Sequence, residues 1–108
     1  MANLIFPLYF DADPVTVTAD DSDYTVASSQ INLGTGVDLT INDAEKVGTF
    51  VNFICTNSTT DATVTFATAA GGASFDKITF AANGDSAECM WTPEGWRVVA
   101  LHQTASIA

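Results

Sequence analysis

The sequence predicts an all-β fold, a single-domain antiparallel β-sandwich or barrel that resembles a jelly roll and has about eight or nine short strands. Two observations lead to this prediction. Apolar and polar residues alternate along most of the chain, for example over residues 15–18 and 37–41, as in strands that bury one face. Turn-forming residues interrupt this alternation about every ten residues, a spacing typical of sandwiches and barrels.

The length and composition indicate one folded unit. A chain of 108 residues with 47% hydrophobic and 15% charged residues can bury one core and is not a disordered tail. We expect residues 1–12 to form an extended N-terminal arm or edge strand, residues 13–102 the β-sandwich domain, and residues 103–108 a C-terminal tail. The sequence shows no linker and no convincing internal repeat.

The arm contains a run, residues 4–10, that is apolar on both faces of an extended strand. Residues 50–55 and 97–101 show the same pattern, with Val99 and Leu101 expected on one face of the last strand. Because one interior cannot cover both faces, we expect these runs to meet another chain. The predicted interface residues are Leu4, Ile5, Phe6, Leu8, Tyr9, Phe10, Phe50, Ile54, Val99 and Leu101. The alternative is that the N-terminal run covers its own sheet as a plug.

The middle of the chain predicts strands with one polar face. In residues 63–66 and 77–80, β-branched or aromatic residues alternate with Thr or Lys. Residues 41–48 predict one helical turn at most, which Gly48 would end.

The segment 75–101 predicts a three-stranded meander. Asn83-Gly84 is a pair favoured in type I′ turns, so it should join the strand at 77–80 to one that begins near Ser86. Pro93, Glu94 and Gly95 then predict a second turn, which leads into the last strand.

The length of this second turn decides where the two tryptophans lie. A three-residue loop with a bulge at Gly95 makes Trp91 face Arg97 and allows a cation–π contact. A loop shorter by one residue puts both indoles on the same face, where they cap one end of the fold. In each register one indole plugs the core, so we interpret Trp91 and Trp96 as structural aromatic residues. The alternative is that they are stacking platforms for a sugar.

The charge is strongly negative and unevenly distributed. The chain has 3 basic and 13 acidic residues, for a net charge of −10, and no Lys or Arg precedes Lys46. Phosphate groups require the opposite sign, so we expect neither nucleic acid nor an anionic membrane as a partner. We also expect no membrane span and no secretory signal, because long apolar runs and a basic leader are missing from the sequence.

Few residues are candidates for catalysis. His102 is the only histidine, and it begins the polar segment "HQTASIA" beyond the last expected strand, where it would be poorly held beside a nucleophile. Cys55 and Cys89 lie in strand-like runs and predict buried free thiols, with a disulfide as the alternative. We therefore expect a protein that is not an enzyme, with no cofactor and no metal.

The sequence leaves open whether the chain binds calcium. Asp11 with Asp13, or Asp20, Asp21 and Asp23, could supply the oxygen ligands that this ion accepts. Runs of this kind are more often solvated turns at strand edges, so the metal-free interpretation is preferred.

A family resemblance adds to these observations. "FDKITFAANGDSAECMWTPEGWRVVA", residues 75–100, resembles the closing meander of small β-rich virion proteins of tailed bacteriophages: a strand, a "GDS" turn, a strand ending in an aromatic residue, then Gly-Trp and an apolar strand. "DSDYTVASSQ" at 21–30, followed by "GVDLTI" and "FVNFICTN", resembles their earlier Thr-rich strands. The resemblance extends over about two-thirds of the chain as a pattern.

The resemblance implies a protein that works by assembly. It implies a structural virion protein of the capsid decoration (cement) or head-fibre type, which forms a homotrimer on the outer capsid surface, binds the major capsid protein and stabilises the phage head. Residues 2–10 would then dock on the shell, and the acidic half would complement basic capsid positions. The alternative is a carbohydrate-binding module or tail-fibre tip domain that uses Trp91 and Trp96.

Overall fold

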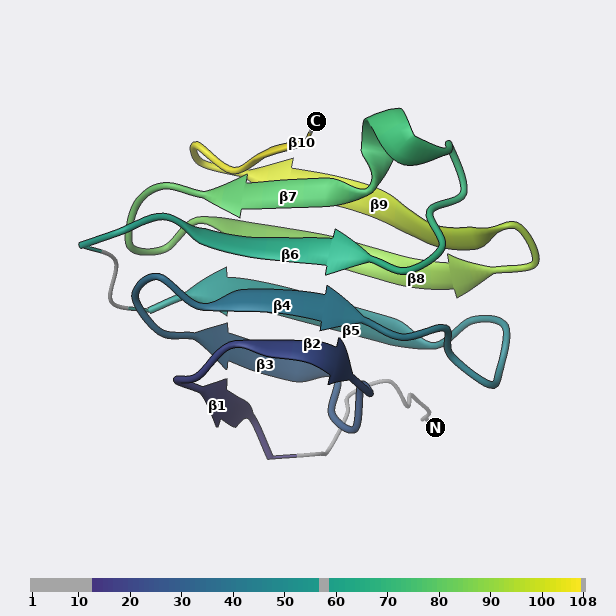
Figure 1. Cartoon of the computed structure of the whole chain (residues 1–108), viewed down its shortest axis with the longest axis horizontal. Coiled ribbons are helices and arrows are strands. Elements are labelled where there is room, and N and C mark those ends of the chain that lie inside the picture. Colours follow the sequence, from purple (N-terminus) through teal and green to yellow (C-terminus); the bar gives the residue numbers. More distant parts are fainter. Residues whose placement is uncertain (1–12, 57–58, 108) are drawn as a thin grey trace, which may run out of the picture.

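The structure, a computed structural model, describes residues 13–56 and 59–107 as two five-stranded sheets packed face to face (Figure 1). Sheet A has the order β1 (Val15–Val17), β3 (Gln30–Leu33), β5 (Phe50–Cys55), β8 (Ser86–Thr92) and β9 (Gly95–His102). Sheet B has the order β10 (Ser106–Ile107), β7 (Lys77–Phe80), β6 (Ala62–Phe66), β4 (Asp38–Ile41) and β2 (Asp21–Tyr24). The prediction of an all-β, single-domain sandwich is confirmed, with ten strands in place of eight or nine.

The sheets are mixed, which differs from the antiparallel arrangement that we predicted. The first six strands alternate between the sheets, so the chain winds as a flattened coil (Figure 1). Each return to a sheet brings the chain back in the same direction, and β1, β3 and β5 are therefore parallel neighbours, as are β2, β4 and β6. The pairings that β7, β8, β9 and β10 make are antiparallel. Alternation in a sequence reports which face is buried, and it carries no information on the direction of the neighbouring strand.

The core lies between the two sheets and follows the predicted alternation. In β5, Val51, Phe53 and Cys55 are fully buried, whereas the residues between them are half-buried on the outer face. In β6 and β7, Val64 and Ile78 are buried in the same way. Apolar burial of this kind is the main term that stabilises the fold.

The predicted meander is wrong at its first turn. β7 belongs to sheet B and β8 to sheet A, so the turn at Asn83-Gly84 crosses between the sheets instead of closing a hairpin. A type I′ turn requires positive φ at both central residues, but Gln103 is the only described non-glycine residue with positive φ. The N–H of Asp85 bonds to the carbonyl of Ala82 (3.1 Å) and closes the turn.

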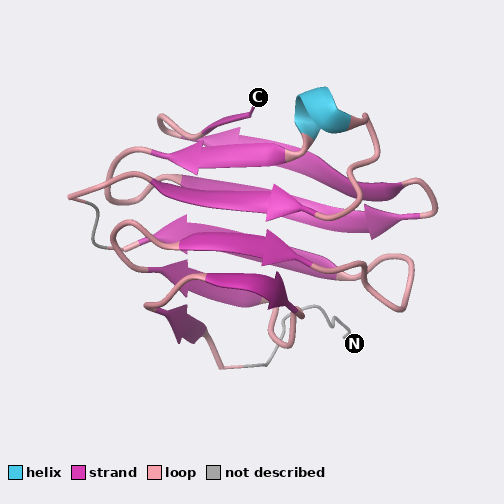
Figure 2. Cartoon of the chain, in the orientation of Figure 1, coloured by secondary structure: helices cyan, strands magenta, loops and turns pink. Residues whose placement is uncertain are grey.

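Strands make up nearly all of the regular structure (Figure 2). A 3-10 helix at Ala73–Phe75 is the one helical element of the described chain. Ile41 ends β4, and residues 42–48 run through bends to a turn at Gly48, so the single helical turn that the sequence allowed at most does not form. Ser106–Ile107, which we assigned to a C-terminal tail, form β10 and pair with β7. No helix in the described ranges has the length and apolar character needed to span a membrane.

Candidate functional site

The turn between β8 and β9 takes the shorter of the two predicted registers. Thr92 pairs with Gly95 and Trp91 pairs with Trp96, so Pro93 and Glu94 alone form the loop. Gly95 has φ 130°, and a Cβ atom at this position would lie 2.8 Å from the carbonyl oxygen of Thr68. Glycine is therefore required where β9 begins.

Both indoles face the interior, and Trp96 belongs to the core. It is 1% exposed, and its ring N–H donates a hydrogen bond to the carbonyl of Asn42 (2.9 Å). Its ring stacks on Phe66 at a centroid distance of 5.7 Å, and the partly buried Trp91 meets it edge-on at 5.6 Å. Trp96 thus offers no open face to a sugar ring. The contact between Trp91 and Arg97 predicted by the longer loop is wrong, because Arg97 pairs with Met90 on the other face.

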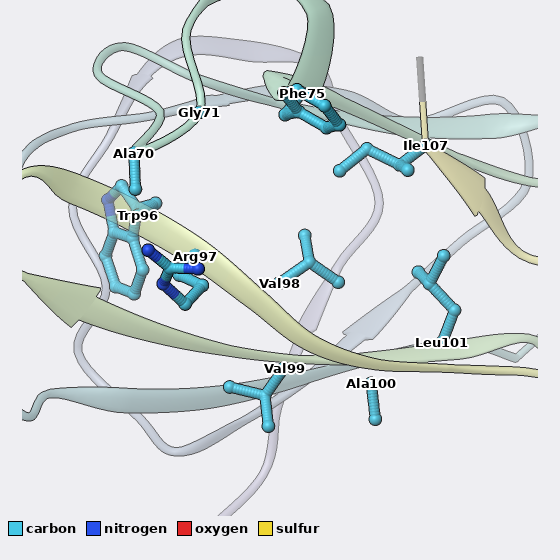
Figure 3. Close-up of a pocket in the computed structure, with 10 residues that line it drawn as sticks. All are labelled: Ala70, Gly71, Phe75, Trp96, Arg97, Val98, Val99, Ala100, Leu101 and Ile107. Carbon is cyan, nitrogen blue, oxygen red and sulfur yellow. The ribbon is translucent and has the colours of Figure 1, made fainter.

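A β-bulge changes the faces of the last strand. Val99 is the extra residue where the pairing of β9 with β8 shifts. Simple alternation predicts Val99 and Leu101 on one face, but the bulge turns Leu101 to the same side as Val98 and leaves Val99 on the opposite side (Figure 3). Val99 is 52% exposed and Leu101 is 36% exposed. The two predicted interface residues are therefore both accessible, on different sides of β9.

An open apolar groove of about 440 Å³, here called the edge groove, lies along β9. One wall is formed by β9 itself, and the side chains of Phe75 and Ile107 lie opposite Val98 and Leu101 (Figure 3). Phe75 is 50% exposed although it is a large aromatic residue. The groove thus exposes apolar surface that a self-contained sandwich would cover.

The edge groove exists because the sandwich is not closed along this side. β9 is the last strand of sheet A, and β10, a strand of only two residues, is the last strand of sheet B. Within the described ranges, the outer backbone of β9 is covered at Trp96, which bonds to Thr68 and Ala70. Along the rest of β9, no described strand pairs with this outer edge, and an edge of this kind readily accepts another strand.

A second, less apolar surface is the outer face of sheet A. The predicted interface residues Phe50 and Ile54 lie there, half-buried, on the central strand β5. Asn52 lies between them and donates a hydrogen bond to the side chain of Gln30 (3.0 Å). Phe50 also pairs with Met90 of β8. This face therefore combines apolar side chains with an amide network, whereas the side chains that line the edge groove are apolar except for Arg97.

The outer face of sheet B is polar. Thr63 of β6 pairs with Asp38 on one side and Thr79 on the other, and the Thr63 hydroxyl donates to the Asp38 carboxylate. Thr40 and Thr65 pair in the same way. A polar face of this kind needs no cover, so the surplus apolar surface lies on sheet A and at the β9 edge.

Asp85 is a fully buried carboxylate that joins two turns. Its Oδ2 atom accepts hydrogen bonds from the N–H groups of Ala81 (2.9 Å) and Ala82 (3.0 Å) and from the Thr104 hydroxyl (2.6 Å), while Oδ1 accepts the Thr104 N–H (3.0 Å). Burial raises the pKa of Asp85, but the hydrogen bonds from Thr104, Ala81 and Ala82 outweigh burial and hold it below the usual value of 3.8. The carboxylate fixes the segment that leads into β10.

His102 lies at the end of β9 and not in a tail as predicted. Its Nε2 atom is 2.6 Å from Oε2 of Glu88 on the neighbouring strand, and both side chains are well exposed. An exposed pair of this kind contributes little to stability. The pair lies beside Ser86 in an open pocket on the outer face of sheet A, which Pro14, Gln30 and Phe50 also line.

The described residues gather no group of three or more His, Cys, Asp or Glu side chains that could hold a metal ion. Asp20 accepts the N–H of Asp38 at the start of β4, and Asp21 accepts the N–H of Asp23 within β2, so both carboxylates bond to the backbone. Asp11 lies outside the described residues.

Cys55 and Cys89 are buried free thiols, as the sequence predicts. Burial and the neighbouring Glu88 raise the pKa of the Cys89 thiol to about 12. The thiolate is the reactive form of cysteine, so Cys89 is inert at neutral pH.

Arg97 places a positive charge at the edge groove, and no carboxylate of the described residues pairs with it. Over the described ranges, Glu88 and His102 form the only ion pair. Arg97 is exposed and lines the groove, and it is one of only 3 basic residues in the chain. A ligand segment that brings an acidic group would find its partner here.

The remaining predicted interface residues, Leu4, Ile5, Phe6, Leu8, Tyr9 and Phe10, lie outside the described residues. Sequence reasoning missed Phe75 and Ile107 as groove residues and Asp85 as a buried support. Phe75 follows a Gly-rich turn and Ile107 stands alone in a polar segment, so neither belongs to a pattern. An aspartate after Asn-Gly is common in surface turns, which conceals the role of Asp85.

No protein-family model matches the sequence, and no curated protein matches it.

Proposed function

We propose that this chain is a non-enzymatic structural protein of a bacteriophage virion. In this proposal it is a capsid decoration, or cement, protein that assembles as a homotrimer on the outer capsid surface, binds the major capsid protein and stabilises the head. The observation that carries the proposal is the apolar surface along an open sheet edge, where Phe75, Val99 and Leu101 are all exposed.

Apolar surface at an open strand edge supports assembly for an energetic reason. Burying apolar surface stabilises a contact by about 25 cal/mol per Å², and an unpaired edge adds main-chain hydrogen bonds. The half-buried Phe50 and Ile54 on sheet A extend this surface away from the edge. The polar threonines of sheet B suit a face turned towards water. A protein with these contrasting surfaces is suited to hold neighbouring subunits together.

The charge supports an acidic protein that docks on a basic surface. The net charge of −10 opposes binding to phosphate groups and favours a protein partner with basic residues. The likeness of residues 75–100 to phage virion proteins favours a phage virion as the assembly in question. In the proposal, acidic turns guide docking on the major capsid protein, and apolar surface holds the copies together.

A binding experiment with purified phage capsids tests the proposal. The chain should bind capsids at saturable sites and raise the temperature at which the heads release DNA. The Phe50→Asp variant should bind more weakly, whereas the control Thr65→Asp, on the polar face of sheet B, should bind as the wild type does. Absence of binding to the capsids of every tailed phage that encodes the chain would contradict the proposal.

A further inference from the structure

We infer that the edge groove is the docking site for the N-terminal segment, residues 4–10, of a second copy of this chain, which adds a strand to β9. The inference deepens the proposed assembly function and rests on it for the existence of contacts between copies. It does not require a capsid, so the two can fail separately.

The groove and the segment match in chemistry. Residues 4–10, "LIFPLYF", contain no charged side chain, and the groove wall is apolar apart from Arg97. Phe75, Val99 and Leu101 are exposed there, so a covering segment removes their side chains from water. Pro7 lacks an N–H group, which is tolerated in a strand at the edge of a sheet.

The lengths also match. Seven residues of strand span about 23 Å at about 3.3 Å per residue, and β9 beyond Trp96 offers six residues, or about 20 Å. β9 has β8 on one side only, and in the described chain its outer backbone is paired at Trp96 alone. Strand addition to such an edge gives affinity through main-chain hydrogen bonds.

Charge sets the direction of the added strand. Asp11 and Asp13 follow the apolar segment directly, and Arg97 stands at the start of the groove without a carboxylate partner among the described residues. Pairing the acidic end of the segment with Arg97 places Leu4 towards the end of β9. The segment therefore runs antiparallel to β9.

For this direction of docking, the distance across the molecule favours a second copy over the chain's own segment. The segment is followed by β1, and β1 and β9 are the two opposite edges of sheet A. Asp13 itself lies against Ser28, just before β3, so about three strand spacings, about 14 Å, separate it from β9. The three residue steps from Phe10 to Asp13 span at most about 11 Å, so the segment of the same copy ends short of Arg97.

Cysteine cross-linking of the full-length chain tests this docking. Leu8→Cys and Tyr9→Cys are made separately, since adjacent strand residues point to opposite sides. Each is mixed with Leu101→Cys protein and oxidised mildly, while Val47→Cys serves as the control because Val47 is 65% exposed and does not line the groove. Cys55 and Cys89 are buried and do not compete. At least one probe should form a covalent dimer with Leu101→Cys at a yield at least tenfold above the control.

The same cross-linking reaction distinguishes docking between copies from docking of the segment in the groove of its own copy. In a Leu8→Cys/Leu101→Cys double variant, docking between copies gives covalent multimers on a denaturing gel without reductant. A cross-linked monomer would show that the segment reaches its own groove, and it would overturn the inference. Cross-linking yields equal to that of the Val47→Cys control, for both Leu8→Cys and Tyr9→Cys, would also overturn the inference.

Oligomeric state provides a second measurement. Leu101→Asp places a charge in the groove and should convert the assembly to monomers by light scattering, while Val47→Asp should leave it intact. Circular dichroism establishes that both variants are folded, and if Leu101→Asp does not fold, the cross-linking result decides. Retention of the oligomer by folded Leu101→Asp overturns the inference. Cross-linking without capsid binding would refute the capsid proposal alone, and capsid binding without cross-linking would refute the docking alone.

Discussion

Asp85 shows at the scale of one residue how a buried charge is held. Its carboxylate accepts four hydrogen bonds, and no positive group takes part. Asp85→Asn removes the charge and turns an amide N–H₂ group towards donors. We expect the free energy of unfolding to fall by about 2 kcal/mol in chemical denaturation, because hydrogen bonds to charged groups are strong. The exposed control Asp61→Asn should change it by less than about 0.5 kcal/mol.

The pH dependence follows from the same carboxylate. The hydrogen bonds hold the pKa of folded Asp85 below the usual value of 3.8, despite burial. A lowered folded pKa means that the ionised group stabilises the fold above the unfolded pKa, and that this stabilisation is lost as the pH falls through the folded pKa. Urea midpoints measured from neutral pH down to about pH 2.5 should therefore fall more steeply for the wild type below about pH 4 than for Asp85→Asn. Parallel curves would contradict this assignment.

The two tryptophans should contribute differently to the free energy of unfolding, although their rings contact each other. Trp96 is buried, stacked on Phe66 and hydrogen-bonded to Asn42, whereas Trp91 is only partly buried. Trp96→Ala should lower the free energy of unfolding by about 3–5 kcal/mol, the usual cost of deleting a buried ring. Trp91→Ala should cost clearly less by the same denaturation assay. Equal losses would show that the indole of Trp91 is as deeply involved in the core.

The turn between β8 and β9 is the element that sets the register of the groove strand. Gly95→Ala must place a methyl group 2.8 Å from a backbone oxygen, whereas Gly48→Ala meets nothing within 4 Å and has only its positive φ to accommodate. We expect Gly48→Ala to cost about 1 kcal/mol and Gly95→Ala at least about twice as much. Thermal unfolding followed by circular dichroism gives both values. A smaller loss for Gly95→Ala would mean that Thr68 moves away freely.

Individual strands could be predicted from the sequence, but their partners could not. β4, β5, β6 and β7 lie where alternation indicates them, because that pattern records which side chains are buried. The parallel coil and the crossing at Asn83-Gly84 depend on contacts between distant segments, which local pattern does not record. The bulge at Val99 is a single extra residue in an apolar run, and it reversed the predicted face of Leu101.

The candidate site was predictable only in part for the same reason. Phe50, Ile54, Val99 and Leu101 were selected because apolar residues occurred on both faces of a strand, and all four retain exposed surface. The opposite wall of the edge groove comes from Phe75 and Ile107, which are far apart in the sequence. Their position follows from the way in which sheet B ends at β10, a strand of two residues in a polar segment.

At the scale of the whole molecule, contacts made by charged residues and contacts made by apolar surface should respond differently to salt. Docking of this acidic chain on capsids should weaken by about tenfold between 50 mM and 500 mM NaCl, because salt screens charged contacts. Association between copies through the edge groove should hardly change over the same range, since apolar burial is not screened. Sedimentation with capsids and light scattering without them give the two curves. If self-association were as sensitive to salt as capsid docking, the assignment of docking to charge and of self-association to apolar surface would be wrong.

This sandwich exposes apolar surface along β9 that its own described residues do not cover, and we propose that further copies of the chain cover it. The molar mass of the full-length chain at micromolar concentration, measured by light scattering during size-exclusion chromatography, tests this most directly. We expect about three times the chain mass of 11.3 kDa, as for a homotrimer. A single species at the mass of one chain would contradict it.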